Sequence, residues 1–557
     1  MSKGMQQVTR REVLGGLGAA TAGAAALSGL GVRNAMASDD GLPTWDHEAD
    51  FVVVGAGCGL AGALAAAVAG ERVIVLETLG IAGGTMALSG GVCWVPNNSV
   101  MQAEGIEDSR EAALTYLYAC TNDCVDTDLA ETFVDRAAEM ADFVQENTDL
   151  TWMISDFRRC YEYHPEFEGA VFRGRSIYPY EDAKPARRGV LLAQAMVGGI
   201  EKAGGEIMYN TKADRLITRS TGADGAKEVV GVRAVGADGN PIYIKAAKGV
   251  LLAAGGFDWN EEMRNAFLHY GSKYTDACVG CDGSGIQMTM SVGAALTNMD
   301  DAWGYPVAKM ASEEGYADGS GHIGFSKSAP GTIMVNRYGE RFCDEASDYD
   351  TVWRAFAQFN AWNNQDDFGL RNLPAYFILD EAAREAVGFD YIHKTAEDAP
   401  DYIFRADTLR ELAEKLGIDP DGFEAAVAEF NENAANGVDP KFHRGESLYD
   451  LLWSQTDMTP VEELTTAKTL RPLDTPPFWG FEVSTGMLGT CGGAKVNQNA
   501  QVIDCFGEVI PRLYCCGNNS GVGAPGAGYT GGGATIAPAL TFAYLAALDA
   551  ATLEAWA

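Results

Sequence analysis

The chain has 557 residues, of which 47% are hydrophobic and 21% are charged, and it contains 66 glycines but only 19 prolines. This composition is typical of a large globular protein with more than one domain, and it excludes a disordered chain, a collagen and a coiled coil. A formal net charge of −36, with no basic patch in the sequence, argues against binding to nucleic acid or to anionic lipid.

The N-terminus has the pattern of an export signal. Arg10 and Arg11 precede an apolar run rich in Gly and Ala from Leu14 to Val32, and Ala35-Met36-Ala37 supplies small residues for cleavage. The pattern predicts a twin-arginine signal over residues 1–37, with export to the periplasm or the extracytoplasmic face. A retained anchor is the alternative. No later segment reaches the ~18 consecutive apolar residues of a membrane span, so we expect none in the mature protein.

Residues 51–77 have the order strand, glycine turn, helix, strand and acid: Phe51–Val54, then Gly55, Gly57 and Gly59, then Leu60–Ala69, Val73–Leu76 and Glu77. Such a βαβ unit points a helix N-terminus at a pyrophosphate and places the acid for the hydroxyls of a ribose. The third glycine comes one residue earlier than in G-x-G-x-x-G. On these residues alone, a tight turn in an ordinary α/β sheet is the alternative to a dinucleotide site.

Three later segments extend the nucleotide-binding pattern. The stretch 83–91 contains Gly83, Gly84, Thr85, Ser89, Gly90 and Gly91, and it suits a loop that passes over a large planar ligand. Val250–Gly256 is an apolar strand that ends in a glycine turn with Ala254 and Gly255. Leu513–Asn518, which ends in Gly517 and Asn518, precedes a glycine-dense stretch and a helix that starts near Thr535 and Ile536. Together these segments predict a discontinuous Rossmann-like domain whose last strand and helix follow a long insertion.

The region between these segments predicts a scaffold and an insertion. Residues 231–235 and 241–245 alternate as in a small β-meander. The capping box at Thr408–Glu411 and the Asp419-Pro420 pair predict helices in the insertion. We expect an α/β fold with a nucleotide-binding domain over residues 48–299 and 456–557. An α+β cap domain over residues 300–455 would cover the site.

Over nearly all of residues 48–557, this order of segments resembles the superfamily of FAD-binding fumarate reductases and 3-ketosteroid dehydrogenases. The resemblance implies FAD as the cofactor, and FAD is favoured over NAD because no second dinucleotide fingerprint is present. The implied cofactor-binding residues are Gly55, Gly57, Gly59, Glu77, Gly83, Gly84, Thr85, Ser89, Gly90, Gly91, Ala254, Gly255, Gly517, Asn518, Thr535 and Ile536.

The dicarboxylate-reducing members of that superfamily carry an arginine four residues after the glutamate of an N-R-x-G-x-R-F-x-N-E segment. Here the segment is Asn336–Glu345, and Tyr349 stands in place of the arginine. The histidine that precedes M-G-G in fumarate reductases is absent from Thr485–Gly493, and no arginine occurs between Gly517 and Gly533. Reduction of fumarate or of a urocanate-like acid is therefore disfavoured.

Three tyrosine-bearing segments resemble 3-ketosteroid Δ1-dehydrogenase. Tyr161–Glu166, followed by Gly174-Arg175-Ser176, is similar to Y-x-x-Y-H-P-E and G-R-S of that family. Glu345–Tyr349 is similar to N-E-A-A-P-Y, and Tyr529–Ala539 to Y-P-G-x-G-A-T-I-G-P-A, with Thr530 in place of the proline.

The resemblance implies four catalytic groups. Tyr529 and the N–H of Gly533 would bind the ketone oxygen as an oxyanion hole, which can contribute ~3 kcal/mol per donor. Tyr349 would remove the proton from the adjacent carbon, and a hydrogen bond from Tyr163 would stabilise its phenolate. Neutral phenols suit an apolar, steroid-like ketone. Packing with one hydrogen bond is the alternative role for each tyrosine.

The remaining functional signals are weaker. Twelve cysteines in so long a chain do not form a disulfide framework, so we expect mostly free thiols. Cys278-Val279-Gly280-Cys281 has no following histidine and no second pair, so we interpret it as structural and expect no metal. His164 is interpreted as a turn residue.

Three functions remain in competition. The first is an exported FAD-dependent 3-oxosteroid Δ1-dehydrogenase that passes electrons to a separate quinone or cytochrome. The second is the reverse reaction, an exported reductase of a steroid-like or other enone used as a terminal electron acceptor. The third is a flavin electron carrier without a substrate of its own. The sequence leaves open the direction, the exact substrate, the oligomeric state and the cleavage of the signal.

Overall fold

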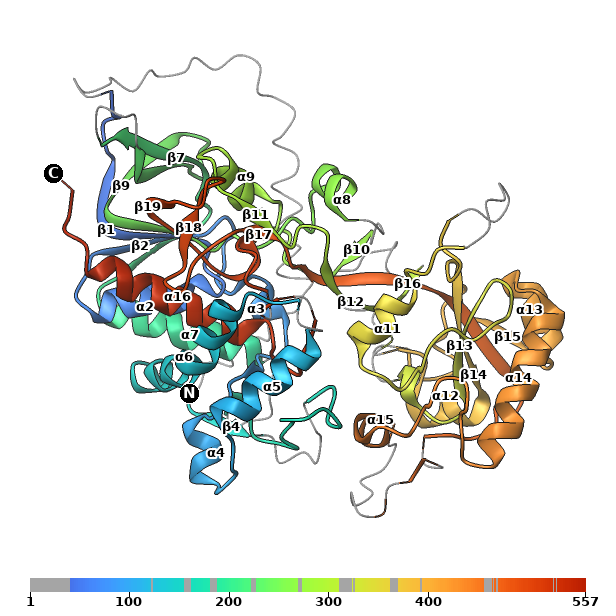
Figure 1. Cartoon of the computed structure of the whole chain (residues 1–557). Helices are drawn as coiled ribbons and strands as arrows, with labels where there is room; N and C mark the ends of the chain where they lie inside the picture. Colours follow the sequence, from blue (N-terminus) through green and yellow to red (C-terminus); the bar gives the residue numbers. More distant parts are fainter. Residues whose placement is uncertain are drawn as a thin grey trace, which may run out of the picture.

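The computed structural model describes residues 41–121, 124–154, 162–180, 188–221, 227–268, 273–309, 323, 326–360, 369–390, 393–454, 463, 465–466, 469–523, 525–526 and 528–556. The predicted export signal and Tyr161 lie outside these residues. Two lobes, each built around its own sheet, are apparent in Figure 1.

The first lobe contains an eight-stranded sheet with the order β18-β19-β9-β1-β2-β6, extended by β8 on β9 and β7 on β8. Neighbouring strands from β19 to β6 are parallel, as in a nucleotide-binding fold. Its strands are β1 (His47–Val54), β2 (Val73–Leu76), β6 (Glu206–Met208), β7 (Lys212–Ser220), β8 (Lys227–Val235), β9 (Pro241–Leu252), β18 (Gln501–Ile503) and β19 (Val509–Cys515).

The predicted meander strand and the predicted strand before the Gly255 turn are one element, β9. Its first half pairs with β8 in the antiparallel meander, and its second half pairs with β1 and β19 in the parallel sheet. The carboxyl ends of β1, β2 and β9 lie side by side because Val54 is in register with both Leu76 and Leu252. The glycine turns and Glu77 that follow these strands therefore meet at one edge of the sheet.

Helices α2 and α16 cover one face of this sheet, and α7 and α6 pack beside them (Figure 1). A Cβ on Gly62 of α2 would lie 2.6 Å from the carbonyl oxygen of Ala543 of α16, so the two helices touch through their backbones. The helices of this lobe are α2 (Gly59–Val68), α3 (Gly84–Leu88), α4 (Ser99–Ala103), α5 (Arg110–Cys120), α6 (Thr127–Glu146), α7 (Arg188–Lys202), α8 (Glu261–Phe267), α9 (Ser284–Met290) and α16 (Ile536–Ala551).

The second lobe contains a six-stranded sheet with the order β10-β16-β14-β13, in which β12 and β15 also pair with β16. Its strands are β10 (Tyr274–Thr275), β12 (Ala302–Ala308), β13 (Thr332–Asn336), β14 (Ala375–Asp380), β15 (Phe404–Ala406) and β16 (Phe478–Thr490). Its helices are α11 (Tyr349–Ala355), α12 (Glu381–Val387), α13 (Leu409–Leu416), α14 (Pro420–Ala435) and α15 (Leu448–Trp453). The side chains of Thr408 and Asp419 cap α13 and α14, as the sequence predicts.

The predicted boundary between the cap domain and the second part of the nucleotide-binding domain, at residues 455 and 456, does not coincide with the point where the chain leaves the cap sheet. The long strand β16, Phe478–Thr490, pairs with strands of the cap sheet, and the chain returns to the first sheet only at β18. Short β10, within the stretch assigned to the first domain, also pairs with β16. The local pattern of an apolar strand does not reveal which of two sheets it will join.

Two small sheets complete the fold: β3 (Cys93–Trp94), β5 (Ser176–Pro179) and β4 (Trp152–Ile154) form one, and β11 (Leu296–Thr297) and β17 (Gly493–Ala494) form the other.

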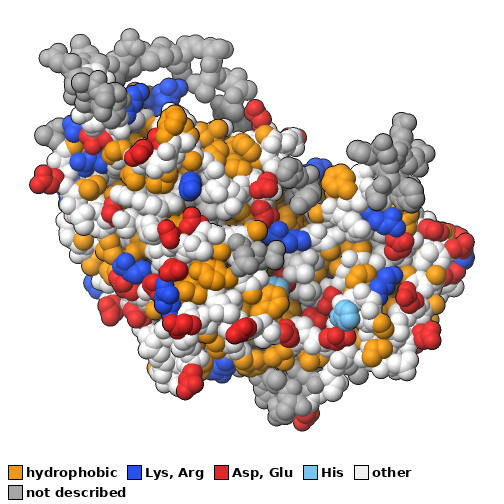
Figure 2. Space-filling model, in the orientation of Figure 1, with side chains coloured by type: hydrophobic (Ala, Val, Ile, Leu, Met, Phe, Trp, Pro, Cys, Tyr) orange, Lys and Arg blue, Asp and Glu red, His pale blue; other side chains and the backbone are white. Residues whose placement is uncertain are grey.

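Figure 2 shows acidic side chains scattered over both lobes of the visible face among apolar and basic ones. No helix among the described residues has both the length and the apolar character to cross a membrane.

Candidate active site

A cavity of about 630 Å³ begins at the glycine turns of the first sheet and reaches a group of aromatic side chains. Of the sequence-predicted site residues, the following line it: Gly55, Gly57, Glu77, Gly84, Thr85, Ser89, Gly90, Gly91, Tyr163, Ala254, Gly255, Tyr349, Gly517, Asn518, Tyr529, Gly533, Thr535 and Ile536. Segments far apart in the sequence thus meet around one space large enough for an extended ligand.

The turn after β1 fits the phosphates of a dinucleotide. Gly55 has φ of +104°, and a Cβ there would lie 2.3 Å from the carbonyl oxygen of Ala253, so only glycine is tolerated. A Cβ on Gly57 would have only one neighbour within 4 Å, the Gly83 carbonyl oxygen at 3.7 Å, so the backbone is bare toward the cavity. Helix α2 begins two residues later with no side-chain cap, which leaves its N-terminus to an anion.

Glu77 is held where a ribose would bind. Its carboxylate accepts hydrogen bonds from the N–H of Ala56 at 2.9 Å and of Leu79 at 2.8 Å, and it lines the cavity while only 6% exposed. Burial raises the pKa of Glu77, and these backbone hydrogen bonds oppose that effect. The carboxylate is therefore oriented before any ligand arrives.

Gly59 and Gly83, predicted to bind the cofactor, do not line the cavity. A Cβ on Gly59 would lie 2.7 Å from the Cβ of Ala253 and 2.9 Å from Cγ1 of Val53, so this glycine lets α2 approach the sheet. A Cβ on Gly83 would lie 2.4 Å from the Cβ of Ala87, within the first turn of α3. Both glycines are required by packing, and their contact with the cofactor stays a prediction.

Several cavity residues were not predicted as site residues, and two of them belong to the Cys278–Cys281 segment that the sequence analysis interprets as structural. Thr78 and Lys212 lie near Glu77, and Asp276, Cys278 and Cys281 follow β10. The Sγ of Cys281 lies 3.4 Å from Oγ1 of Thr85, and burial raises the pKa of Cys278 to about 11. Every described cysteine is a free thiol, and the described residues contain no cluster of His, Cys, Asp and Glu able to hold a metal ion.

Three tyrosines meet at the aromatic end of the cavity. The hydroxyl of Tyr163 donates to that of Tyr349 at 2.9 Å. The ring of Tyr529 stacks on that of Tyr163 and meets that of Tyr349 edge-on, with centroids 5.4 Å apart in both pairs. The sequence motifs predicted this set but not the packing of the rings on one another.

Each of the three tyrosines stands in a firmly held segment. Tyr349 is the first residue of α11, which the Asp348 carboxylate caps by accepting from two backbone N–H groups at 3.0 Å. The backbone N–H of Tyr163 donates to the carbonyl of Thr530 at 3.1 Å, and Tyr116 donates its hydroxyl to the same carbonyl. The segment that carries Tyr163 thus supports the loop that carries Tyr529.

Burial is the largest influence on the pKa values of these three tyrosines. It raises the pKa of Tyr163 and Tyr349 well above the ordinary value near 10, and it also raises that of Tyr529. Hydrogen bonds to Tyr349 and Thr535 oppose the shift at Tyr529. The predicted hydrogen bond from Tyr163 to Tyr349 is present, but burial, the neighbouring Tyr163 and Tyr529 and the hydrogen bonds to them all raise the pKa of Tyr349, so Tyr349 is not a ready phenolate.

Gly533 presents a free donor beside the tyrosines. Its N–H makes no hydrogen bond within the described residues, whereas its carbonyl accepts from the N–H of Trp94 at 3.1 Å. Its φ is +91°, and a Cβ there would lie 2.4 Å from the carbonyl oxygen of Val92. The backbone at this position can therefore approach a ligand only as glycine.

The walls near the tyrosines are aromatic and apolar. Trp303 of β12, Trp453 of α15 and Leu488 of β16 line the cavity, and Tyr449 packs on Tyr163 with centroids 5.2 Å apart. Among the described residues that line the cavity, the charged side chains are Glu77, Lys212 and Asp276, and none of them belongs to the elements that carry the tyrosines, Trp303 or Trp453. Trp303 and Trp453 were missed by the sequence analysis because neither lies in a recognisable motif.

Comparisons with known proteins agree with this geometry. A family model for the FAD binding domain matches residues 50–536. The chain is 31% identical to 4-oxocyclohexanecarboxylate 2-dehydrogenase of Sinomonas cyclohexanicum, over 89% of this chain and 92% of that protein. It is also 31% identical to 3-oxosteroid 1-dehydrogenase of Mycobacterium tuberculosis, over 91% of this chain and 98% of that protein.

A solved structure supports the same relationship. The 3-ketosteroid delta1-dehydrogenase of Sterolibacterium denitrificans, in complex with 1,4-androstadiene-3,17-dione, matches with a TM-score of 0.79 and 28% identity. The match covers 91% of this chain and 99% of that one. The predicted fold class, the resemblance and FAD as the cofactor are thereby confirmed. The chain belongs to the FAD-binding-domain family of flavoproteins, in the branch that includes the 3-oxosteroid 1-dehydrogenases, and it is an FAD-dependent oxidoreductase.

Proposed function

We propose that the protein removes two hydrogens from adjacent carbons beside a ring ketone, with a 3-oxosteroid as substrate and a C1–C2 double bond as product. The observation that carries this proposal is the cluster of Tyr163, Tyr349 and Tyr529 with the free N–H of Gly533 at the apolar end of the cavity. When bound, FAD supplies the acceptor for the hydride from C1.

In the proposed reaction the protein activates the substrate through its ketone. The hydroxyl of Tyr529 and the N–H of Gly533 donate to the ketone oxygen and stabilise the enolate that develops there. A neutral phenol and a backbone amide carry no charge that the apolar substrate would have to desolvate. These two donors make the C2 proton more acidic.

Tyr349 takes the C2 proton. Its side chain lines the cavity next to Tyr529, and Tyr163 donates a hydrogen bond to its oxygen, which stabilises the phenolate while it lasts. The raised pKa of Tyr349 makes its phenolate scarce but strongly basic, which suits removal of a weakly acidic proton beside a ketone.

The relatives leave two substrate classes to compare, 3-oxosteroids and 4-oxocyclohexanecarboxylate. A small carboxylate needs a cation near the ring, and the one lysine or arginine among the described residues that line the cavity is Lys212, which lies beside the Glu77 segment on the nucleotide side. Large aromatic walls at Trp303 and Trp453 instead suit a fused apolar ring system. We therefore favour the steroid.

An anaerobic titration tests the proposal. The purified yellow protein is mixed with 4-androstene-3,17-dione or with 4-oxocyclohexanecarboxylate while the visible flavin band is followed and the product mass is measured. Bleaching by the steroid with loss of two hydrogens supports the proposal, and bleaching by the carboxylate alone moves the substrate to the small ketone. If only the reduced protein reacts, with reoxidation by a dienone, the enzyme is the reductase. Silence in both directions contradicts the proposal.

We further propose that the protein is exported by the twin-arginine route and passes its electrons to a separate quinone or cytochrome. The Arg10-Arg11 pair and the apolar run after it support export. Cell fractionation with N-terminal sequencing tests it: a mature start near Ser38 outside the cytoplasm is expected, and an intact cytoplasmic chain would contradict it.

A further inference from the structure

The N–H of Gly533, a proposed oxyanion donor, belongs to the same peptide unit as the carbonyl of Gly532. A peptide unit is planar and trans, so its N–H and its carbonyl point in opposite directions. Both glycines line the cavity. A group that holds the Gly532 carbonyl therefore also decides where the Gly533 N–H points.

A side chain from another segment holds that carbonyl. The hydroxyl of Ser176, a residue that is 4% exposed, donates to the carbonyl oxygen of Gly532 at 2.7 Å. Among the described residues, this is the one hydrogen bond that the carbonyl accepts. Glycine tolerates both positive and negative φ, so a peptide unit between two glycines can rotate unless a contact fixes it. The Ser176 hydroxyl is such a contact.

The neighbouring peptide units of the loop are held by backbone donors. The carbonyl of Gly533 accepts from the N–H of Trp94 at 3.1 Å. The carbonyl of Thr530 accepts from the N–H of Tyr163, also at 3.1 Å. A side-chain substitution leaves these backbone donors in place. Removal of the Ser176 hydroxyl should therefore free one peptide unit without releasing the whole loop.

Ser176 is itself firmly placed. It lies in β5, where it pairs with Trp94 of β3 in the three-stranded sheet. The residue before it, Arg175, is 1% exposed. The guanidinium of Arg175 donates to the carboxylate of Asp108 at 3.0 and 2.6 Å and to that of Glu162 at 3.3 Å. The hydroxyl thus approaches the loop from a rigid support.

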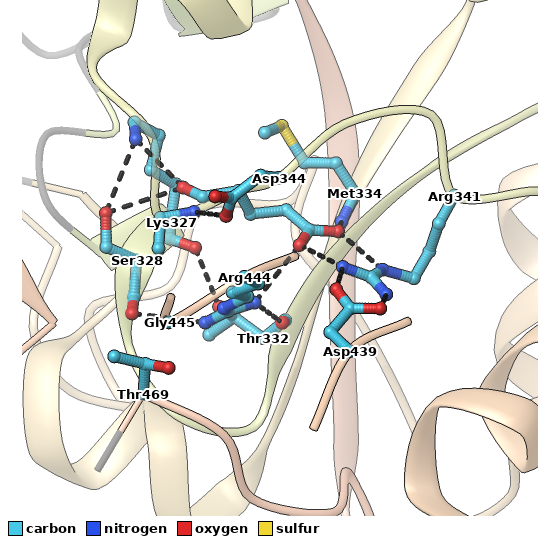
Figure 3. A network of polar contacts seen from close by, with 12 residues as sticks. Lys327, Ser328, Thr332, Met334, Arg341, Asp344, Asp439, Arg444, Gly445 and Thr469 are labelled. Carbon is cyan, nitrogen blue, oxygen red and sulfur yellow. Dashed lines mark hydrogen bonds and ion pairs between the residues drawn. The ribbon is translucent and has the colours of Figure 1, made fainter. Parts of the chain in front are cut away.

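The proposed base, Tyr349, is held by a separate set of contacts in the second lobe (Figure 3). The Nζ of Lys327 donates to the carbonyl oxygens of Glu345, at 2.9 Å, and of Ser347, in the segment that leads to α11. The carboxylate of Glu345 receives two hydrogen bonds from the guanidinium of Arg341, at 2.9 and 2.7 Å. A substitution in β5 should therefore leave the base in its place.

We propose that Ser176 is a positioning residue that fixes the peptide unit between Gly532 and Gly533 and thereby aims the Gly533 N–H at the ketone oxygen of the substrate. Ser176 is not among the residues that line the cavity, so it acts through this peptide unit. When the unit rotates, the oxyanion hole loses one of its two donors. This inference rests on the proposed function for the nature of the substrate.

The first test compares the FAD-loaded wild type with Ser176→Ala and with a control, Thr541→Val. Thr541 is fully buried, and its hydroxyl donates to the carbonyl oxygen of Ala537 at 2.8 Å. The control thus removes a similar hydrogen bond from the same lobe. Anaerobic stopped-flow absorbance gives the limiting rate of flavin reduction by 4-androstene-3,17-dione and the dissociation constant of that steroid.

Ser176→Ala should lower the limiting rate by at least about tenfold, because charge develops on the ketone oxygen in the transition state. Its dissociation constant should change by less than about threefold, because the neutral ketone depends less on the donor. The dependence of the rate on pH should keep its wild-type slope, since the base is unchanged. Thr541→Val should retain wild-type values. A wild-type limiting rate in Ser176→Ala would overturn the inference.

A second readout needs binding but no turnover. The infrared stretch of the C3 ketone is measured for bound 1,4-androstadiene-3,17-dione, isotope-labelled at that ketone. Hydrogen bonds to the oxygen lower this frequency, so it should be higher in Ser176→Ala and in Tyr529→Phe than in the wild type and in Thr541→Val. A slow Ser176→Ala variant with an unshifted ketone would also overturn the inference.

The two readouts separate the inference from the proposed function. If the ketone frequency shifts as expected but the steroid does not reduce the flavin of the wild type, the proposed dehydrogenation fails and the function of Ser176 stands. If the steroid does not bind, the infrared comparison is made with 4-oxocyclohexanecarboxylate labelled at its ketone. Failure of both ketones to bind would overturn the proposed function and the inference together.

Discussion

In the proposed reaction Tyr349 must act as a base although burial raises its pKa. Its oxygen lies 2.9 Å from that of Tyr163, so a hydrogen bond can follow the charge as it forms. At neutral pH the hydroxyl holds its proton in almost every molecule. The deprotonated form is the active one, and its fraction rises tenfold with each pH unit below the pKa.

We therefore expect the rate of anaerobic flavin reduction at saturating steroid to rise by about tenfold per pH unit between pH 7 and 9, without a plateau. Stopped-flow absorbance of the flavin band measures this rate directly. A plateau beginning near pH 7 would mean that a group of lower pKa removes the proton.

The Tyr349→Phe and Tyr529→Phe variants should each keep bound FAD and lose turnover by at least about 10²-fold, because one loses the base and the other an oxyanion donor. Tyr243→Phe, on the meander strand β9, is the matched control and should retain wild-type rates. The measurement is the single-turnover rate with 4-androstene-3,17-dione, alongside the flavin absorbance of the purified protein. Near-normal rates in both active-site variants would overturn the catalytic assignment.

The residues of the site differ in how far they could be predicted. Tyr349 and Tyr529 lie in local motifs, so their identity was readable from the sequence. Trp303 and Trp453 belong to β12 and α15, and only the folding of the cap lobe brings them to the cavity. The raised pKa of Tyr349 could not be predicted either, because it results from burial, and burial depends on the tertiary structure.

Gly57 and Gly59, in the turn after β1, have different functions because they lie in different structural settings. Gly57 faces the cavity, whereas Gly59 is the first residue of α2 and faces the side chains of Ala253 and Val53. The helix must lie close to the sheet for its N-terminus to reach a phosphate. In the sequence both residues belong to the same run of alternating glycines, so their separate functions could not be predicted.

A pair of alanine substitutions separates these two functions. Gly57→Ala should weaken FAD binding by at least about tenfold with little effect on the melting temperature of the apoprotein, because its methyl group has room in the protein but enters the cavity. Gly59→Ala should destabilise the apoprotein by about 1–3 kcal/mol, because its Cβ would lie 2.7 Å from that of Ala253. Fluorescence titration with FAD and thermal unfolding of the apoprotein provide the two measurements. Equal effects of the two variants on both readouts would show that the turn acts as a single unit.

At the scale of the whole molecule, the order of the lobes was predictable but their junction was not. Three segments predicted a discontinuous first lobe: the βαβ unit, the apolar strand near Leu513 that rejoins the first sheet, and the helix after Thr535. Strand β16 pairs with β10, β12, β14 and β15, and such nonlocal pairing leaves no local trace in the sequence. The cavity lies where the two lobes meet, so its aromatic end was the part of the site that was hardest to predict from the sequence.

Charge is the other property of the whole molecule, and it bears on the electron acceptor. A net charge of −36 creates a negative potential around the protein, and acidic side chains are scattered over both lobes of the face shown in Figure 2. A cationic carrier such as a basic cytochrome would be attracted from beyond contact distance, and salt would screen that attraction. A neutral quinone would feel no such field.

We expect the rate of reoxidation of the reduced protein by a basic cytochrome to fall by about tenfold or more as ionic strength rises from about 0.01 to 0.5 M. The rate with a neutral water-soluble quinone should change by less than about twofold over the same range, because screening acts only on charge. Stopped-flow mixing of dithionite-reduced protein with each acceptor, at matched driving force, measures both rates. A cytochrome rate that is insensitive to salt would mean that the overall field does not guide the carrier. A cytochrome rate far below the quinone rate even at low salt would identify the quinone as the better partner, since attraction alone would then fail to bring the cytochrome close enough to the cavity for electron transfer.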